Sequence, residues 1–310
     1  MTTQTNNSQT DKPRTNDRQA DDRQTNDSPG ARNAARRSPA TVLVTSATGK
    51  TGRRVAERLA ARGVTVRAGS RGGATPFDWE APETWAPALR GADAAYLAYY
   101  PDLAAPGAAE AMRTFGRLAA SSGVRRLTLL SGRGEPEAVV AEEALRAAAE
   151  GVELTVVRAA FFAQNFSEGL LAEGVAEGAV VFPAGDTAEP FVDVDDIADV
   201  VVETLTADGH AGRVHELTGP RPVGFAEVAA DIARASGRPV VYRAVSEADY
   251  AELLTGFGLP APEAAWLASL FTTLLDGHNA SVTDGVKRVL GREPRSFTAF
   301  ADATWATGRA

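Results

Sequence analysis

The sequence predicts an α/β fold, in which a doubly wound parallel sheet is combined with a smaller, mostly helical C-terminal lobe. Three observations support this prediction. Short apolar, β-branched runs alternate with amphipathic helical patterns from residue 41 to about residue 160. A glycine-containing turn joins the first such strand to the first helix, and the alternation is lost after residue 160. Strands separated by helices of this length require right-handed crossovers within one parallel sheet, which is the Rossmann-like arrangement.

The first predicted strand is Thr41–Val44, a short run of the kind that is buried on both faces of a parallel sheet. Residues 51–62 then form an amphipathic helix with Val55 and Leu59 on one side, and Gly63 ends it. Further strands are predicted at 64–68, 76–79, 94–99, 126–131, 153–158 and near 213–218, and further helices at 83–90, 108–121, 137–149 and near 195–206. Ligands of such sheets bind beyond the carboxyl ends of the strands, so candidate site residues are expected there.

Composition divides the chain into three parts. Residues 1–40 contain no Val, Ile, Leu, Phe, Tyr or Trp, so they cannot offset their ordering entropy and are predicted to be a disordered tail. Residues 41–160 are predicted to form the sheet domain, completed by about 187–218. Residues 161–186 and 219–310 are predicted to form a lobe on the substrate side of the sheet.

Composition and charge also exclude several classes of protein. The chain has 32 basic and 40 acidic side chains, and residues 1–40 carry +2, so the remainder carries −10; this argues against a nucleic-acid-binding surface. There is no cysteine, and no metal site is predicted. No stretch reaches the roughly 18 apolar residues of a membrane span, and there is no signal-peptide core, so we expect a cytoplasmic protein without a membrane partner. Monomer and homodimer both remain open.

The strongest chemical signal is the loop Val44–Gly52, VTSATGKTG, between the first strand and the first helix. Such a turn points backbone N–H groups and a helix N-terminus at the phosphates of a dinucleotide. Gly49 permits close backbone approach and Gly52 permits close helix–strand packing, while Ser46 stands where the first glycine of this fingerprint is usual. Two alternatives remain open: a nucleotide-hydrolysing phosphate loop, which would need glycine in place of Val44, and a glycine turn that binds nothing.

The end of the second predicted strand indicates which dinucleotide is bound. An NAD site usually has an acidic residue about 20 residues past the loop, where it binds the ribose hydroxyls. Here Ser70 and Arg71 stand at that place, Arg71 being 19 residues after Gly52, and a guanidinium beside a hydroxyl suits the 2′-phosphate of NADP(H). A solvated surface arginine is the alternative. Asp78 and Trp79 are candidates to flank the adenine, although Trp79 can equally be a core residue.

Five segments of the chain form a recognisable series in the order in which they occur. They are VTSATGKTG at 44–52, AGSRGG at 68–73, LLSGRG at 129–134, VVRAAFFAQNF at 156–166 and FVDVDDIADV at 191–200. Together they resemble the NmrA-like group of atypical short-chain dehydrogenase/reductases, which includes NADPH-dependent quinone reductases, and the resemblance extends over residues 41–309. It implies an extended Rossmann fold, NADP(H) as cofactor and hydride transfer to a quinone or another conjugated carbonyl compound. Some members of this group bind NADP(H) only as a redox signal.

The resemblance also implies roles for individual residues, with NADP(H) held by the 41–160 domain and a small molecule as substrate. The residues matched to cofactor contacts are Thr45, Ala47, Thr48, Gly49, Lys50, Thr51 and Gly52 in the loop, Arg71 at the 2′-phosphate, Ala98 and Tyr99 beside the ribose, and Ser131 beside the nicotinamide. The residues placed on the substrate side are Tyr100, Arg133, Phe161, Phe162 and Asn165.

The catalytic residue is not assigned by the sequence. Short-chain dehydrogenases usually use a tyrosine followed four residues later by a lysine, which lowers the pKa of the tyrosine. None of the five tyrosines has a lysine at that spacing, and the corresponding region, 135–143, contains no Tyr, His or Lys. The candidates are Tyr99, Tyr100, Ser131 and His278. A readily reduced quinone can also take its proton from water.

Two interpretations of function follow from these observations. The favoured one is an NADPH-dependent oxidoreductase that reduces a quinone or another conjugated carbonyl compound, with a place in secondary metabolism as one interpretation. The alternative is a non-catalytic protein that senses NADP(H) and regulates a partner. The missing tyrosine–lysine pair keeps both open.

Two groups of acidic residues receive structural interpretations. Asp193, Asp195 and Asp196 precede an apolar helical run, so helix capping and the helix dipole explain them better than a bound metal. Glu142 and Glu143 lie on a predicted helix, and we interpret them as part of its solvent-exposed face.

Overall fold

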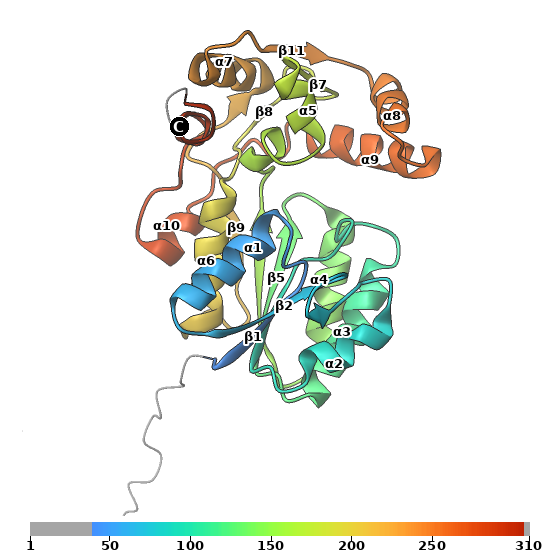
Figure 1. The fold of residues 1–310 in the computed structure, drawn as a ribbon, viewed down its shortest axis with the longest axis vertical. Helices are drawn as coiled ribbons and strands as arrows, with labels where there is room; N and C mark the ends of the chain where they lie inside the picture. The colour runs from blue at the N-terminus through green and yellow to red at the C-terminus, as the bar shows by residue number, and fades with distance from the viewer. Residues whose placement is uncertain (1–38, 307–310) are drawn as a thin grey trace, which may run out of the picture. The chain divides into compact units, whose positions relative to one another are not determined.

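The central feature of the fold is a seven-stranded parallel sheet with the strand order β3-β2-β1-β4-β5-β6-β9 (Figure 1). Its strands are β1 (Thr41–Val44), β2 (Thr65–Ser70), β3 (Thr75–Pro76), β4 (Ala94–Leu97), β5 (Arg126–Gly132), β6 (Glu153–Ala159) and β9 (Val214–Leu217). The order of strands reverses between β1 and β4, which is the switch point at which doubly wound sheets bind ligands. The predicted fold class is confirmed.

The computed structural model describes residues 39–306, and of Leu170 it describes the backbone only. The predicted tail at 1–40 therefore lies outside the described residues, apart from Pro39 and Ala40. Within residues 39–306, no helix combines the length and the apolar character that crossing a membrane would require.

Helices cover both faces of the sheet because its strands are apolar on both sides. Along β1, Leu43 points to one hydrophobic cluster while Val42 and Val44 point to another, and all three are fully buried. The first cluster contains residues of α2 (Trp85–Leu89), α3 (Ala108–Ser121) and α4 (Pro136–Ala148). The second contains residues of α1 (Lys50–Ala61) and α6 (Val194–Thr206). Figure 1 shows these two sets of helices on opposite sides of the strands.

Most predicted elements of the sheet region agree with the observed bounds to within about two residues. The helix predicted at 108–121 coincides with α3, and the strand predicted at 126–131 is β5. The strand predicted at 76–79 is shorter, because Asp78 donates its backbone N–H to Thr84 Oγ1 and Trp79 turns into the core. A short helix, η1 (Pro82–Thr84), precedes α2.

After β6 the chain builds a second group of elements around its own aromatic core. They are η2 (Ala163–Phe166), α5 (Leu170–Ala176), β7 (Ala179–Phe182), β8 (Ala188–Glu189), β10 (Val223–Gly224), α7 (Phe225–Ser236), β11 (Val241–Ala244), α8 (Glu247–Gly256), α9 (Ala261–Leu274) and α11 (Phe297–Trp305). Helix α10 (Gly285–Leu290) packs instead against the second cluster of the sheet, with α6 and β9. The predicted helical character is observed, but the pairs β7–β11 and β8–β10 were not predicted. Phe166, Phe182 and Phe225 are fully buried in this third cluster, so the aromatic stretch after residue 160 is core-forming.

Candidate functional site

A cavity of about 520 Å³ lies beyond the carboxyl ends of β4, β5 and β6, and we call it the main cavity. Its volume is in the range that small-molecule sites occupy. Helix α9 contributes apolar side chains to the wall, among them Trp266, Leu270 and Phe271. Eight residues singled out in the sequence line this cavity: Lys50, Tyr99, Tyr100, Ser131, Arg133, Phe161, Phe162 and Asn165. The fold thus gathers the expected substrate-side residues at one place.

The glycine loop has the geometry of a phosphate-binding turn. Helix α1 begins at Lys50, directly after Gly49, and no side chain caps its N-terminus, so the first amide groups are left to water or a ligand. A Cβ atom on Gly52 would collide with the carbonyl group of Ser46, which explains the need for glycine. Ser46 itself has φ of +49°, in the left-handed region that usually favours glycine. The backbone therefore follows the three-glycine pattern although the first glycine is replaced.

The predicted loop residues divide into a buried and an exposed set. Thr45 is fully buried, and its hydroxyl accepts a hydrogen bond from the backbone of Ala98 at 2.9 Å, which joins the ends of β1 and β4. Ala47, Thr51, Gly52 and Ala98 are buried as well. The loop residues that reach the surface are Thr48, Gly49 and, partly, Lys50. These three and the helix amides are the groups that could contact phosphates, while Thr45 shapes the loop.

Arg71 is exposed just past the end of β2, and its guanidinium lies 5.8 Å from the ring centre of Tyr100. Among residues 39–306 it makes no ion pair or hydrogen bond through its side chain. Ser70, the last residue of β2, is half-buried beside it. An arginine with a free guanidinium beside a serine hydroxyl is what the 2′-phosphate prediction requires. The structure also brings Arg71 to Tyr100, a contact that the sequence did not indicate.

Lys50 reaches from the loop to the lobe that follows β6. Its Nζ donates to Oδ1 of Asn165 at 2.8 Å, across 115 residues of sequence. Burial lowers the pKa of Lys50, although the nearby carboxylate of Glu168 opposes that effect. The pair places a cation and an amide at the rim of the main cavity, next to the loop.

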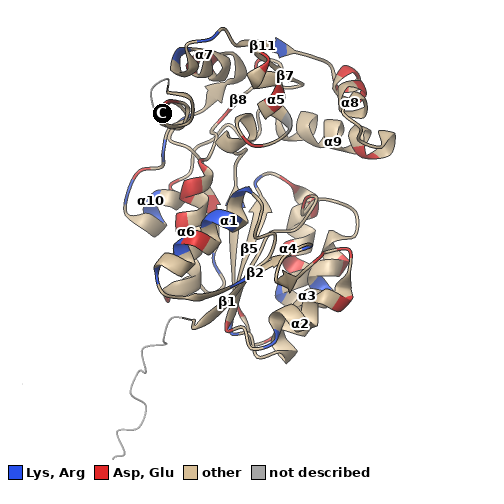
Figure 2. Ribbon diagram, in the orientation of Figure 1, with Lys and Arg blue, Asp and Glu red and all other residues tan. Residues whose placement is uncertain are grey.

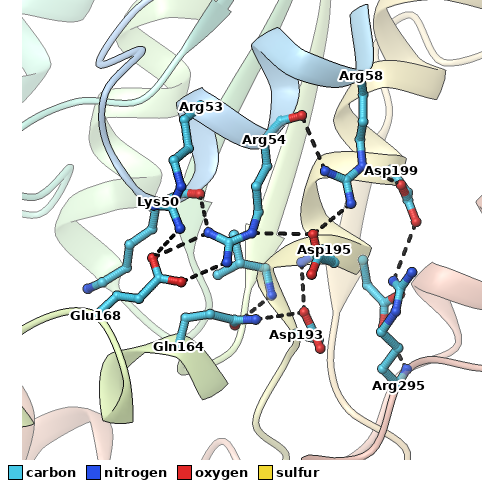
Figure 3. A network of polar contacts seen from close by, with 12 residues as sticks. Lys50, Arg53, Arg54, Arg58, Gln164, Glu168, Asp193, Asp195, Asp199 and Arg295 are labelled. Atoms are coloured by element: carbon cyan, nitrogen blue, oxygen red, sulfur yellow. Dashed lines mark hydrogen bonds and ion pairs between the residues drawn. The ribbon is translucent and has the colours of Figure 1, made fainter. Parts of the chain in front are cut away.

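Beside this pair, arginines and carboxylates from four segments form a connected set (Figure 3). We call the following residues the arginine–carboxylate cluster: Arg53, Arg54, Arg58, Glu168, Asp195, Asp196, Asp199, Arg292 and Arg295. Arg54 bonds to Glu168 at 2.7 Å and approaches Asp195 at 3.3 Å, so it joins α1 to α6 and to the segment before α5. Figure 2 shows the basic residues of α1 beside the acidic residues of α6. The cluster holds the glycine loop against the lobe that carries Asn165.

Sequence reasoning missed Gln164 and Glu168 in this region. Gln164 is buried, donates to Asp193 at 2.8 Å and accepts from the backbone of Val194 at 2.8 Å. Asp193 caps α6 by accepting from the backbone of Asp195, which confirms the capping interpretation for that residue. Asp195 and Asp196 instead pair with arginines. The segment AQNF offered no periodic signal, because its partners lie about 30 residues away in sequence.

Ser131 donates its hydroxyl proton to Glu142 at 2.6 Å. The interpretation of Glu142 as a solvent-exposed residue is wrong: its side chain is fully buried and pairs with Arg158 at 2.7 Å. The reason is that Arg158 on β6 lies under this face of α4 and supplies the counterion that burial of a carboxylate demands. Ser131 lines the main cavity, but its hydroxyl proton is used in the hydrogen bond to Glu142 and is not free to bond to a substrate.

Arg133, just past the end of β5, bonds to the C-terminal segment that contains His278. All three guanidinium nitrogens of Arg133 donate to protein groups: Glu216, the backbone of Asn279 and the hydroxyl of Ser281. This favours a positioning role for Arg133 over direct contact with a substrate. His278 bonds to Asp276 and approaches the carbonyl oxygen of Gly134 at 3.3 Å, and it is not among the residues that line the main cavity.

Four acidic residues that the sequence did not single out also line the main cavity: Asp102, Glu135, Glu189 and Glu263. Glu135 and Glu189 are 8% and 3% exposed, and no N–H or O–H donor of the described residues reaches Oε2 of either. Burial raises the pKa of Glu189 to about 7. Burial, and then the negative charge of Asp102 beside it, raise the pKa of Glu135 well above its usual range. Polar groups of this kind in a cavity indicate a ligand-binding role.

The two residues expected to flank an adenine differ in exposure. Trp79 is 6% exposed, donates its indole N–H to the carbonyl oxygen of Ala98 at 2.8 Å and packs against Phe77 and Trp85. It is therefore a core residue, and little of its ring is left to contact a ligand. Asp78 is half-buried, and its carboxylate accepts from the backbone of Glu80 at 3.1 Å.

Several known proteins are similar to this chain over most of its length, although no protein-family model matches it. It is 34% identical to the uncharacterized oxidoreductase YesF of Bacillus subtilis, over 84% of this chain and 94% of that protein. It is 31% identical to the NAD(P)H azoreductase of Xenophilus azovorans, over 80% of this chain and 85% of that protein. It is 32% identical to the festuclavine dehydrogenase easG of Aspergillus fumigatus, over 84% of this chain and 97% of that protein.

A solved structure shares the fold. The NADPH-dependent quinone oxidoreductase QOR2 of Escherichia coli, complexed with NADPH, superimposes with a TM-score of 0.67 at 23% identity, covering 84% of this chain and 99% of that one. The fold, the glycine loop at the switch point and relatives above 30% identity that span nearly the whole of their own length lead to one conclusion. The chain belongs to the NmrA-like group of atypical short-chain dehydrogenase/reductases and is an oxidoreductase.

Proposed function

We propose that this oxidoreductase binds NADP(H) and uses it to reduce a quinone or another conjugated carbonyl compound. The observation that carries the proposal is the main cavity, which lies beyond the strand ends beside the glycine loop and has aromatic walls. The names of two similar proteins, an NAD(P)H azoreductase and an NADPH-dependent quinone oxidoreductase, support this class of reaction. The similar festuclavine dehydrogenase supports a place in secondary metabolism.

The residues present fit such a cofactor. The uncapped N-terminus of α1, with Gly49 and Lys50, would hold the pyrophosphate, and Ser70 and Arg71 would hold the 2′-phosphate. When bound, the nicotinamide supplies a hydride. Phe161 and Phe162 would orient a flat acceptor and exclude water, since both line the cavity at the end of β6. Residues 41–160, with about 187–218, would then be the cofactor domain, and 161–186 with 219–310 the substrate lobe.

The test is a steady-state assay of NADPH consumption by the full chain, with a panel of quinones and enones. We expect turnover with at least one acceptor and a binding constant for NADPH in the micromolar range or below by calorimetry. Absence of turnover with every acceptor, despite tight NADPH binding, would overturn the proposed reaction.

That same outcome would favour the second candidate, a non-catalytic NADP(H)-sensing protein. The observation in its favour is that no tyrosine of this chain is followed four residues later by a lysine. A sensor should bind NADPH and NADP⁺ with clearly different affinities. An enzyme needs no such difference, so calorimetry with both forms of the cofactor separates the two.

A further inference from the structure

The cavity carboxyls suggest how the missing proton donor is replaced. We propose that the carboxyl pair of Asp102 and Glu135 is the acid of the reaction, with Glu135 as the catalytic residue that protonates the reduced acceptor. Asp102 acts as a positioning residue that keeps the proton on Glu135. This inference rests on the proposed function, because it names the acid of that reaction.

The position of Glu135 suits this role. It lies three residues beyond the end of β5, the sheet edge at which ligands of doubly wound folds bind. Its carboxyl group lies against Gly132, where a Cβ atom would collide with it. Glu135 and Asp102 both line the main cavity, and their side chains are within hydrogen-bonding reach of each other. The pair is therefore built into the wall of the site and not exposed on the surface.

The charges around the pair keep one proton on it. The groups that act on Glu135 are Asp102, from the loop after β4, and Glu137 and Glu142, from α4, and all are acidic. The backbone N–H of Ala104 donates to Asp102 at 2.8 Å, which stabilises the ionised form of Asp102 relative to that of Glu135. Burial raises the pKa of both carboxyls. Two neighbouring carboxyls, one buried and one half-buried, do not both ionise readily at neutral pH, so Asp102 carries the charge and Glu135 the proton.

Four basic groups in or near the cavity wall bond to residues other than Asp102 and Glu135. Lys50 bonds to Asn165, and Arg158 pairs with Glu142. Arg133 is held by Glu216 and by residues 279–281, and His278 is held by Asp276. Glu263, which also lines the cavity, is a further acidic side chain. No basic side chain of the described residues forms an ion pair or hydrogen bond with Asp102 or Glu135.

The four candidates from the sequence are less suited to donate a proton. The hydroxyl of Ser131 donates its hydrogen bond to Glu142, and His278 is not among the residues that line the cavity. Tyr100 is 59% exposed beneath Arg71. Tyr99 packs against Trp79, and burial, with the charge of Glu80, raises its pKa, which weakens it as an acid.

The chemical step balances without another reactant. As the conjugated carbon of the acceptor receives a hydride, the electron pair of its π-system moves to the carbonyl oxygen. The O–H bond of Glu135 breaks, its proton forms a new O–H bond on that oxygen, and the electrons of the broken bond stay on the Glu135 carboxylate. Solvent returns the proton to the pair before the next turnover. General acid catalysis of this kind contributes about 10²–10⁴-fold to rate.

The experiment compares Glu135→Gln with Glu143→Gln, which removes an exposed charge from α4 and leaves the pair and the groups that act on it intact. Two acceptors are used: a neutral enone, which needs a proton, and a cationic dye, which becomes neutral on accepting hydride and needs none. We expect Glu135→Gln to lower kcat with the enone by about 100-fold or more at neutral pH, and with the dye by less than about 3-fold. Glu143→Gln should retain kcat with both acceptors. Equal kcat of Glu135→Gln and native protein with the enone would overturn the proposal.

A second readout does not depend on turnover. Carbon-13 NMR of the cofactor-free protein, labelled at the glutamate carboxyl carbons, should show a glutamate that titrates far above the ordinary range. That signal should be absent from Glu135→Gln and present in Glu143→Gln. The variant Asp102→Asn should move the titration to lower pH, together with the alkaline limb of kcat for the enone. A Glu135 carboxyl that titrates normally would overturn the proposal while native turnover leaves the proposed function standing. A native protein without turnover would instead overturn the function.

Discussion

Two acidic regions of this molecule contain the same kinds of side chain in opposite environments. In the arginine–carboxylate cluster, burial alone would raise the pKa of Glu168, but hydrogen bonds from Arg54 and Arg53 outweigh burial and lower it. The pKa of Asp199 is lowered in the same way by Arg58 and Arg292. In the main cavity, Glu135 and Glu189 have no arginine bonded to them, and burial raises the pKa of both. Arg133 also lines the cavity, but its guanidinium donates to Glu216, Asn279 and Ser281 and to neither of these two carboxyls.

The difference separates structural carboxylates from chemically useful ones. A paired carboxylate is fixed in its ionised form and joins segments of the chain. An unpaired buried carboxyl can hold a proton at neutral pH, at a cost in stability. The changes below disturb one region at a time.

The largest effect is expected where the cluster is most buried. The carboxylate of Asp196 is fully buried, accepts from the backbone of Arg295 at 2.7 Å and pairs with Arg292 at 2.7 Å. Asp196→Asn leaves two guanidinium groups without their shared anion, and we expect it to lower the free energy of unfolding by about 3 kcal/mol. Urea unfolding monitored by circular dichroism measures the change. A loss below about 1 kcal/mol would show that the cluster is a solvated network of ion pairs that contributes little to the free energy of unfolding.

At Glu135 in the main cavity, we expect the free energy of unfolding to fall as the pH rises, the opposite of what a paired carboxylate produces. The pKa of Glu135 is higher in the folded protein than its ordinary value of 4.5, so its contribution is fully present below about pH 4.5 and is lost as the pH rises. The free energy of unfolding of the native protein should therefore fall relative to Glu135→Gln by up to about 1.4 kcal/mol per pH unit above that point. Thermal unfolding of both proteins between pH 5 and pH 9 tests this. If the stabilities of the two proteins vary with pH in parallel, the Glu135 carboxyl has an ordinary pKa and the prediction is wrong.

Arg71, whose guanidinium lies over the ring of Tyr100, provides the third contrast. Arg71 makes no ion pair with the described residues, whereas Arg53 of α1 pairs with Glu168 at 2.6 Å. Arg71→Ala should reduce the preference for NADPH over NADH by about 10–100-fold, since charge-assisted hydrogen bonds contribute about 1.5–3 kcal/mol. Arg53→Ala should leave that preference unchanged. Calorimetry with both cofactors measures it, and an unaltered preference in Arg71→Ala would refute the 2′-phosphate assignment.

The smallest effect is expected at a carboxylate that belongs to neither region. Glu143 lies next to the buried Glu142 on α4, but its side chain is 63% exposed and its pair with Arg146 spans 3.4 Å. Glu143→Gln should change the free energy of unfolding by less than about 0.5 kcal/mol. Urea unfolding of Glu143→Gln and Glu142→Gln side by side should show a large loss for Glu142→Gln alone.

Periodicity predicted the sheet and its helices because those patterns are local. The helix at 108–121 was predicted to the residue, since its apolar side chains recur at helical spacing. The strands β7 and β11 were missed, because their pairing joins segments about 60 residues apart and neither shows a strong alternation. Glu142 was misassigned for the same reason: its counterion lies on another element.

The candidate site was predicted in outline and missed in its chemistry. Motifs placed Lys50, Tyr99 and Phe161 at one cavity. They did not indicate Asp102 and Glu135, because a carboxyl in a loop looks like a solvated residue until its neighbours are known. These two carboxyls differ from those of the arginine–carboxylate cluster in having no basic side chain bonded to them. That property depends on neighbours in space, which a sequence pattern does not show.

The position of Trp266 gives the main cavity a built-in optical signal. Trp79 and Trp85 are buried in the core of the sheet region, and Trp305 packs on Phe300, whereas Trp266 lies half-buried in the cavity wall. An aromatic acceptor that enters the cavity would quench the indole emission of Trp266, whereas the other three tryptophans do not line the cavity. Acceptor entry could thus be timed in a stopped-flow instrument without a label, separately from the absorbance change of the nicotinamide.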